Sequence, residues 1–168
     1  MRSRYLILAS VLGLAISVPS LAQTTYVAVL TGASEVPMNP SSATGNATVV
    51  LNAAQTQVSI SCQFQNLLGT YTASHLHAPG PIGVNAAVII GFVSPGAPWV
   101  FSNANHNGTL VNFLAAITPV QVGYLNSGQV YANVHSTVFP GGEIRGQMGA
   151  QPVPTSKSTW SRVKSLFR

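Results

Sequence analysis

The sequence predicts an all-β fold, a Greek-key β-sandwich or barrel of about eight strands with one short helix. Charged residues make up only 5% of the chain, far below the roughly 25% of an ordinary soluble domain. This excludes a coiled coil and a disordered polyelectrolyte, which both need abundant charge. The 15 glycines and 11 prolines are scattered without a fixed period, which excludes collagen. Between them lie short segments of alternating apolar and polar residues, which are typical of strands in a sandwich.

The N-terminal residues 1–22 have the features of a signal peptide. Arg2 and Arg4 are basic, residues 5–18 form an apolar run, and residues 20–22 offer the small-x-small pattern of a cleavage site. The apolar run is shorter than the ~20 residues that span a bilayer as a helix. We therefore expect cleavage after Ala22 and a secreted or periplasmic mature protein.

The mature body, residues 23–150, contains the expected strands and the helix. Strands are expected at residues 26–31, 45–52, 58–65, 74–78, 85–93, 110–117, 129–137 and 143–149. The run 85–93 is continuously apolar, which predicts a strand buried on both faces, and Asn107-Gly108 predicts a hairpin turn. Residues 118–121 (Thr-Pro-Val-Gln) fit a capping box, so a helix is expected over 120–125.

Cys62 is the chain's single cysteine, so no intramolecular disulfide can form. It shares one strand face with Val58, Ile60 and Phe64, and we expect it to be a small core residue.

The charges of the body are few, and their positions exclude one class of partner. Between residues 23 and 152 only Glu35, Glu143 and Arg145 are charged, which gives a net charge of −1. A nucleic-acid-binding face needs clustered Lys and Arg, so the body does not bind nucleic acid by this criterion. An unidentified protein or envelope component is the expected partner.

Glu143 and Arg145 are two residues apart on the last strand, which places them on the same face. Glu35 is the one other acidic residue available to this arginine. An unpaired buried charge is costly, so we expect a Glu–Arg–Glu or Glu–Arg clasp that links the first and last strands. The alternative is an arginine that guides anions to a neighbouring metal.

Three of the four histidines lie on expected strands. His75 and His77 project from one face while Leu76 points to the core, and His135 lies on the outer face with Tyr131 and Asn133. If the two strands are neighbours, the three imidazoles form a nitrogen site suited to one copper or zinc ion. The alternative is that they are polar strand residues that bond to their neighbours. His106 lies in an expected loop and is predicted to be exposed.

Five sequence blocks resemble the chordin-type (CHRD) domain, and they occur in that family's order. The blocks are residues 30–37, 43–48, 74–80, 130–136 and 140–147. The resemblance covers about residues 25–149 and implies an extracellular β domain. It implies a binding or structural module of the envelope or extracellular space more than an enzyme.

A more distant likeness concerns mechanism. His75, His77, His135 and the segment Gly-Gly-x-x-Arg145-Gly are similar to the copper ligands and active-site arginine of copper/zinc superoxide dismutases. The chain has no aspartate and one cysteine, so the zinc site and the disulfide of those enzymes cannot be built. The likeness therefore implies a copper-only site, and any enzyme activity would be that of a copper-dependent oxidoreductase. A Ser/His/Asp hydrolase is excluded because the chain has no aspartate.

The C-terminal residues are distinct from the body. Residues 151–156 are a Pro-rich linker, and residues 157–168 place Trp160, Val163 and Phe167 at helical spacing among four basic residues. Such a basic amphipathic segment is typical of binding to an anionic membrane surface. The alternative is a solvated terminus, because an isolated helix of twelve residues is marginal.

Overall fold

The computed structural model describes residues 22–92 and 98–152. Its strands are β1 (Thr24–Thr31), β2 (Thr44–Leu51), β3 (Gln57–Gln65), β4 (Tyr71–His77), β5 (Val88–Gly91), β6 (Trp99–Ser102), β7 (Asn107–Ala116), β8 (Tyr131–Ser136), β9 (Ile144–Gln147) and β10 (Gly149–Ala150). One α-helix, α1 (Pro119–Asn126), and one 3₁₀ turn, η1 (Gly32–Ser34), accompany them. The all-β class with a single short α-helix is thereby confirmed. The expected signal peptide, most of the linker and the basic tail lie outside the described residues.

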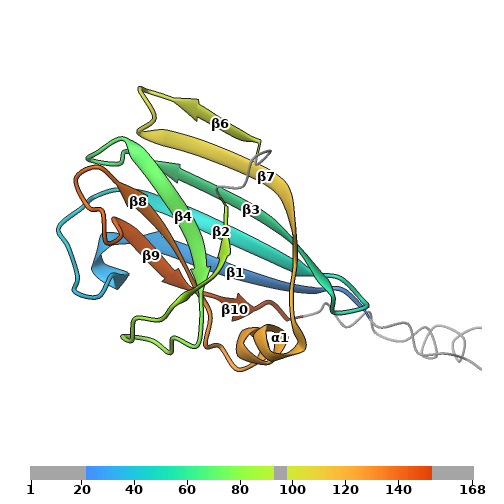
Figure 1. The fold of residues 1–168 in the computed structure, drawn as a ribbon. Coiled ribbons are helices and arrows are strands. Elements are labelled where there is room, and N and C mark those ends of the chain that lie inside the picture. The colour runs from blue at the N-terminus through green and yellow to red at the C-terminus, as the bar shows by residue number, and fades with distance from the viewer. Residues whose placement is uncertain (1–21, 93–97, 153–168) are drawn as a thin grey trace, which may run out of the picture.

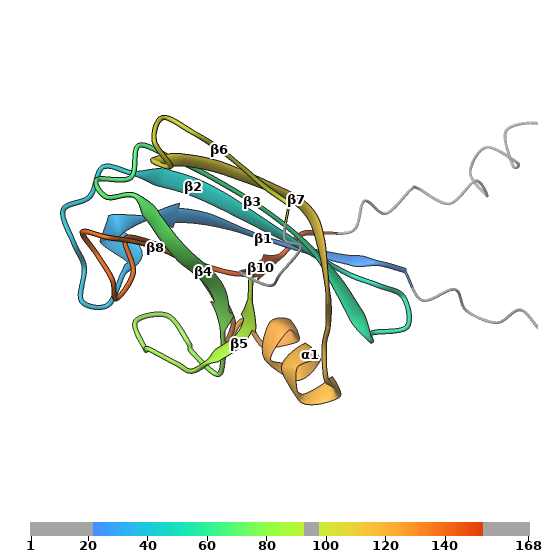
Figure 2. The same cartoon turned by 45° about the horizontal axis from the view of Figure 1, so that its top comes forward.

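All strands belong to one antiparallel sheet with the order β5-β4-β8-β9-β1-β2-β3-β7-β6, and β10 pairs with β1. The sheet curls back on itself, so that β4, β8 and β9 form a layer over β1, β2 and β3 (Figures 1 and 2). The chain crosses between the layers from β3 to β4 and again from β7 to β8. These crossings make β4 and β8 hydrogen-bonded neighbours, with His75 opposite Asn133 and His77 opposite Tyr131.

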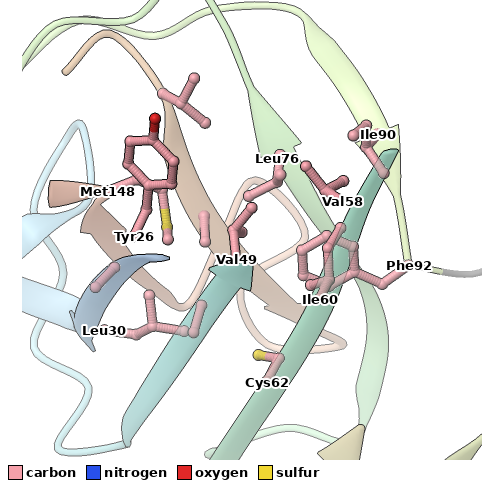
Figure 3. Close-up of a cluster of buried hydrophobic side chains, with 14 of the residues drawn as sticks. Tyr26, Leu30, Val49, Val58, Ile60, Cys62, Leu76, Ile90, Phe92 and Met148 are labelled. Carbon is pink, nitrogen blue, oxygen red and sulfur yellow. The ribbon is translucent and has the colours of Figure 1, made fainter. Parts of the chain in front are cut away.

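The core lies between the two layers, and strand alternation fills it. In β3 every second residue is buried, so Val58, Ile60 and Cys62 point inward while the serines and glutamines between them are partly or fully exposed. Leu76 of β4 and Phe92 meet them from the opposite layer (Figure 3). Full burial of one such aliphatic side chain contributes about 1.5–3 kcal/mol to stability.

Cys62 is 3% exposed, and burial raises the pKa of its thiol to about 12. The thiol is therefore protonated at neutral pH, and the predicted core role is confirmed.

The helix forms where the capping box predicted it. Thr118 Oγ1 accepts a hydrogen bond from the backbone N–H of Gln121, and Gln121 Oε1 accepts one from the N–H of Thr118. Pro119 occupies the first turn, where its missing N–H costs nothing. Buried Val122 and Leu125 hold the helix against the body.

Two local expectations are wrong. The apolar run 85–93 contributes only the four-residue strand β5, which lies at an edge of the sheet, so Val88 is 50% exposed while Ile90 is 7% exposed. An irregularity in the pairing with β4 places Ile90 opposite buried Leu76 and Val88 opposite His77 on the outward face, so the run is not buried on both faces. Asn107-Gly108 begins β7 instead of forming the hairpin turn, which lies at residues 103–106.

The strand that precedes this turn, β6, was not expected from the sequence. Its Trp99 and Phe101 pack with Phe64 and Tyr71, whose stacked rings lie 5.4 Å apart between centroids. Aromatic packing from separate strands therefore fixes a segment that is too short to show a clear alternation.

Candidate metal centre

The three strand histidines meet on the outward face of the β4–β8 pair. Leu76 is fully buried in the core, so the strand alternation turns His75 and His77 to the opposite face. His135 of β8 lies on that face too, and one ring nitrogen of each histidine lies within 4.8 Å of the others. The expected convergence of the three imidazoles is therefore present in the structure.

The closest contact joins two of the rings directly. His75 Nδ1 lies 3.0 Å from His135 Nε2. The ring centroid of His75 lies 5.4 Å from that of His77 and 4.9 Å from that of His135. The ring planes are steeply inclined to each other in both pairs. The rings meet edge to face and are not stacked, and one nitrogen of each lies within 4.8 Å of the others.

Backbone carbonyls fix the orientation of two of these rings. His77 Nδ1 lies 2.9 Å from the carbonyl oxygen of Ala86, and His135 Nδ1 lies 2.9 Å from that of Pro140. A carbonyl only accepts, so each Nδ1 carries the proton and each Nε2 carries a free lone pair. This arrangement, with the far nitrogen anchored by an acceptor, is the usual outer shell of a metal-binding histidine.

The amide of Asn133 lies between the two free nitrogens. Its Oδ1 position is 3.1 Å from Nε2 of His77 and 3.1 Å from Nε2 of His135, and the residue is 3% exposed. The two ends of an amide exchange by a half turn, so this group can present N–H to the lone pairs or oxygen to an ion.

The electrostatics of the cluster keep the imidazoles neutral. Burial, followed by the competing positive charges of the neighbouring His135 and His77, lowers the pKa of His75 to about 4. Burial is also the main cause that lowers the pKa values of His77 and His135. Neutral imidazole is the form that binds a metal, so the cluster is ready for one at neutral pH.

Aromatic and cationic side chains flank the cluster on the side of β9. The ring of Tyr131 stacks on that of His77 at 4.7 Å with planes 3° apart, and the guanidinium carbon of Arg145 lies 3.4 Å from the Tyr131 centroid. The guanidinium also donates to Asn85 Oδ1 at 2.9 Å and to the carbonyl of Val84 at 2.8 Å.

The clasp expected among Glu35, Glu143 and Arg145 takes a different form. Arg145 donates its hydrogen bonds to two neutral oxygens, Asn85 Oδ1 and the carbonyl oxygen of Val84. Among the described residues it forms no salt bridge with either glutamate. Glu143 lies just before β9 and outside the strand. Its carboxylate is fully buried and accepts hydrogen bonds from the hydroxyls of Ser41 and Ser136 and from the N–H of Leu68.

Glu35 is also buried, and its Oε1 has no hydrogen-bond partner among residues 22–92 and 98–152. Burial raises the pKa of Glu35 to about 7, although the positive charge of Arg145 and a backbone hydrogen bond from Val36 oppose this rise. Arg145 therefore acts on Glu35 through space and not by direct pairing.

His106 stands apart from the cluster. It is half-buried, and its Nδ1 contacts the carbonyl oxygen of Leu67, so the ring is anchored to a neighbouring loop. The expectation of an exposed side chain is wrong for this reason, whereas its absence from the three-histidine group agrees with the sequence analysis.

Several contributors to the site carry no sequence signal. The carbonyls of Ala86 and Pro140 act through the backbone, so residue type gives no indication of them. Asn133 was placed on the correct face by alternation, but only the structure shows that it lies between two ring nitrogens.

Comparison with known proteins adds a family. The model of the CHRD domain matches residues 26–148. No curated protein and no solved structure matches the chain. Among the described residues, no helix has the length and apolar character to cross a membrane.

Proposed function

The chain belongs to the CHRD-domain family, a binding or structural module, and we propose that this module is exported and holds one copper ion. The ligands are His75, His77 and His135. The alternative that these are merely polar strand residues predicts hydrogen bonds alone and no measurable metal affinity.

The observation that supports this proposal most is the convergence of three neutral, oriented imidazoles. Nitrogens bound to one ion at about 2.0–2.1 Å in tetrahedral geometry are roughly 3.3 Å apart. His75 Nδ1 and His135 Nε2 are already 3.0 Å apart, and one nitrogen of each of the three rings lies within 4.8 Å of the others. Coordination through His75 Nδ1 requires its proton to move to Nε2 of the same ring. Small rotations of the side chains would bring all three nitrogens to bonding distance.

The donor set favours copper over other biological cations. Calcium and magnesium require several oxygen ligands, and the cluster offers three nitrogens with one amide oxygen beside them. Imidazole suits copper and zinc, and the Irving–Williams order places Cu(II) above zinc at a common site. Three protein ligands leave a coordination position open, which suits a carrier or a weak redox site.

Export and membrane contact rest on the sequence. The basic, apolar and small-residue segments of residues 1–22 support removal of a signal peptide, and mass spectrometry of the mature protein should give Gln23 as its first residue. The basic residues of 157–168 support contact with an anionic membrane. Replacement of Lys157, Arg162, Lys164 and Arg168 by Gln should then reduce binding to phosphatidylserine vesicles.

The copper proposal is tested by titration of the metal-free mature protein. We expect one Cu(II) per chain, weaker binding of Zn(II) and no binding of Ca(II) in isothermal calorimetry. The double variant His75→Ala/His77→Ala should show no heat of Cu(II) binding. The variant His106→Ala, which removes a histidine outside the cluster, should keep it. A Cu(II) titration unchanged by the double variant would show that the cluster is not the site.

A further inference from the structure

We propose that Arg145 is a positioning residue for the copper site, because it holds residues 84–86 where the Ala86 carbonyl fixes the ring of His77. This inference rests on the proposed function and names the residue that controls its geometry. It gives Arg145 a role different from both a charge clasp and an anion guide.

The first step is the pair of hydrogen bonds by which Arg145 holds the loop after β4, at Val84 and Asn85. Its side chain is 2% exposed, and its two terminal nitrogens reach different acceptors on adjacent residues, the side chain of Asn85 and the backbone of Val84. A guanidinium can hold two acceptors in one plane, whereas a lysine offers a single charged point. Because the side chain is 2% exposed, the guanidinium is closed to an anion from solvent.

Backbone hydrogen bonds fix the two ends of this loop, from Gly80 to Gln129 and from Ala78 to Ala87, and Arg145 holds the exposed part between them. Residues 81–85 are all exposed, and Ile82 is 84% exposed. A segment that buries so little apolar surface gains its order from specific hydrogen bonds. The other side-chain bond of Asn85, donated to the carbonyl of Val36, orients the same amide and does not replace the contact with Arg145.

The second step passes through Tyr131. Its strand, β8, lies between β4 and β9, so its ring is placed between His77 and Arg145. The tyrosine hydroxyl accepts a hydrogen bond from the N–H of Ala86 at 3.1 Å. The cation therefore holds both the ring that stacks on His77 and the residues next to Ala86.

The third step ends on the metal ligand. The carbonyl of Ala86 accepts the Nδ1 proton of His77 at 2.9 Å, while Tyr131 covers one face of the same imidazole. The plane of the ring and its tautomer are both set by groups that Arg145 holds. Loss of the cation should leave the imidazole in place but free to turn away from the other two ligands.

The experiment compares Cu(II) binding by the wild type, Arg145→Met and Arg145→Lys. Changes in the outer shell of metal ligands weaken binding roughly 10- to 100-fold, and we expect a loss of this size for Arg145→Met. Arg145→Lys should bind Cu(II) more tightly than Arg145→Met and less tightly than the wild type. It keeps the positive charge but lacks the two terminal guanidinium nitrogens that reach two acceptors. The Cu(II) electron paramagnetic resonance spectrum should change in Arg145→Met, and in the metal-free protein the Nδ1 proton signal of His77 should exchange faster with water.

Two milder variants keep the test decisive if Arg145→Met does not fold. Asn85→Ala removes one acceptor on the loop, and Tyr131→Phe removes the hydroxyl that holds Ala86. Each should weaken copper binding, whereas Tyr26→Phe, which removes a tyrosine hydroxyl bonded to Asn126 of α1, should not.

The outcomes separate the two proposals. If the wild type binds no copper, the proposed function fails. Suppose instead that the wild type binds copper. If the folded Arg145 variants then keep the wild-type affinity and spectrum, or if Asn85→Ala and Tyr131→Phe keep them, the positioning role of Arg145 is wrong. A loss of thermal stability without a change in spectrum or affinity would also overturn it.

Discussion

His75 Nδ1 lies 3.0 Å from His135 Nε2, although 60 positions separate the two residues in the chain. They are diagonal neighbours on adjacent strands, because His135 pairs with Ala73 and His75 pairs with Asn133. Since His135 Nδ1 donates to Pro140, the proton between the two rings belongs to His75. An ion that enters the cluster must displace this hydrogen bond and its proton, and it must also replace the contacts of the Asn133 amide with Nε2 of His77 and His135.

A bound metal should stabilise the fold. A ligand that binds only the folded state at 100 times its Kd adds about 2.7 kcal/mol to the free energy of unfolding. We expect Cu(II) to raise the melting temperature of the mature protein by several degrees and EDTA to reverse the rise. Differential scanning calorimetry measures both effects.

The matched variants for this prediction are His135→Ala and His106→Ala. The first removes a ligand from the cluster, and the second removes a half-buried histidine outside it. Copper should stabilise only the His106 variant. Equal stabilisation of both by copper would argue against the cluster.

The sequence was sufficient for the strands whose alternation is long. Residues of β3 alternate over nine positions, so the buried face and the core role of Cys62 could be predicted. It was not sufficient for β5 and β6, which have four residues each. Their positions depend on which strands lie beside them, and that is a property of the whole sheet.

The site divides in the same way. Alternation alone placed three histidines on one face, because period two holds within each strand. The neighbour relation of β4 and β8 needed the crossing connections of the fold. The contact of Arg145 with Val84 needed a loop conformation, and no periodic pattern describes a loop.

Gly142 should be the least replaceable residue of the turn before β9. Its φ of 134° is a conformation that side chains rarely adopt, and an added Cβ would collide with the carboxylate of Glu35. Backbone strain of this kind costs about 1–3 kcal/mol. We expect Gly142→Ala to lower the free energy of unfolding by at least that amount in urea denaturation.

The neighbouring Gly141 is the natural control, because a Cβ added there meets nothing within 4 Å. Gly141→Ala should change the stability by less than about 0.5 kcal/mol. A loss of stability as large as that of Gly142→Ala would mean that the turn, and not the contact with Glu35, is sensitive.

Glu35 should make stability fall as pH rises. Its pKa is raised from 4.5 to about 7 in the folded state, so the folded protein holds this proton more tightly than the unfolded chain. The stabilisation is complete below about pH 4.5 and is lost as pH rises through about 7. With allowance for partial solvent screening, the loss should be about 1–3 kcal/mol.

The histidines oppose this trend, because their lowered pKa values make stability fall as pH drops below about 6.5. The comparison with Glu35→Gln isolates the carboxyl group, since the histidines are common to both proteins. The difference in unfolding free energy, wild type minus variant, should decrease between about pH 4.5 and 7. If this difference is flat across that range, the carboxyl of Glu35 titrates normally.

Asn133 should determine which metal the cluster prefers. Its amide lies 3.1 Å from Nε2 of both His77 and His135, so Asn133→Asp places a carboxylate of the same shape beside two ligands. A His₃Asp set supplies the four anchored donors of a tetrahedral zinc site, and the negative charge attracts the cation. We expect at least a tenfold gain in Zn(II) affinity, which corresponds to about 1.4 kcal/mol.

Asn133→Leu, which fills similar space without an oxygen, should show no gain, and a competition titration with a zinc chelator measures all three proteins. Equal zinc affinity of wild type and Asn133→Asp would place the amide outside the coordination sphere, and the three nitrogens would then have to hold the ion without residue 133.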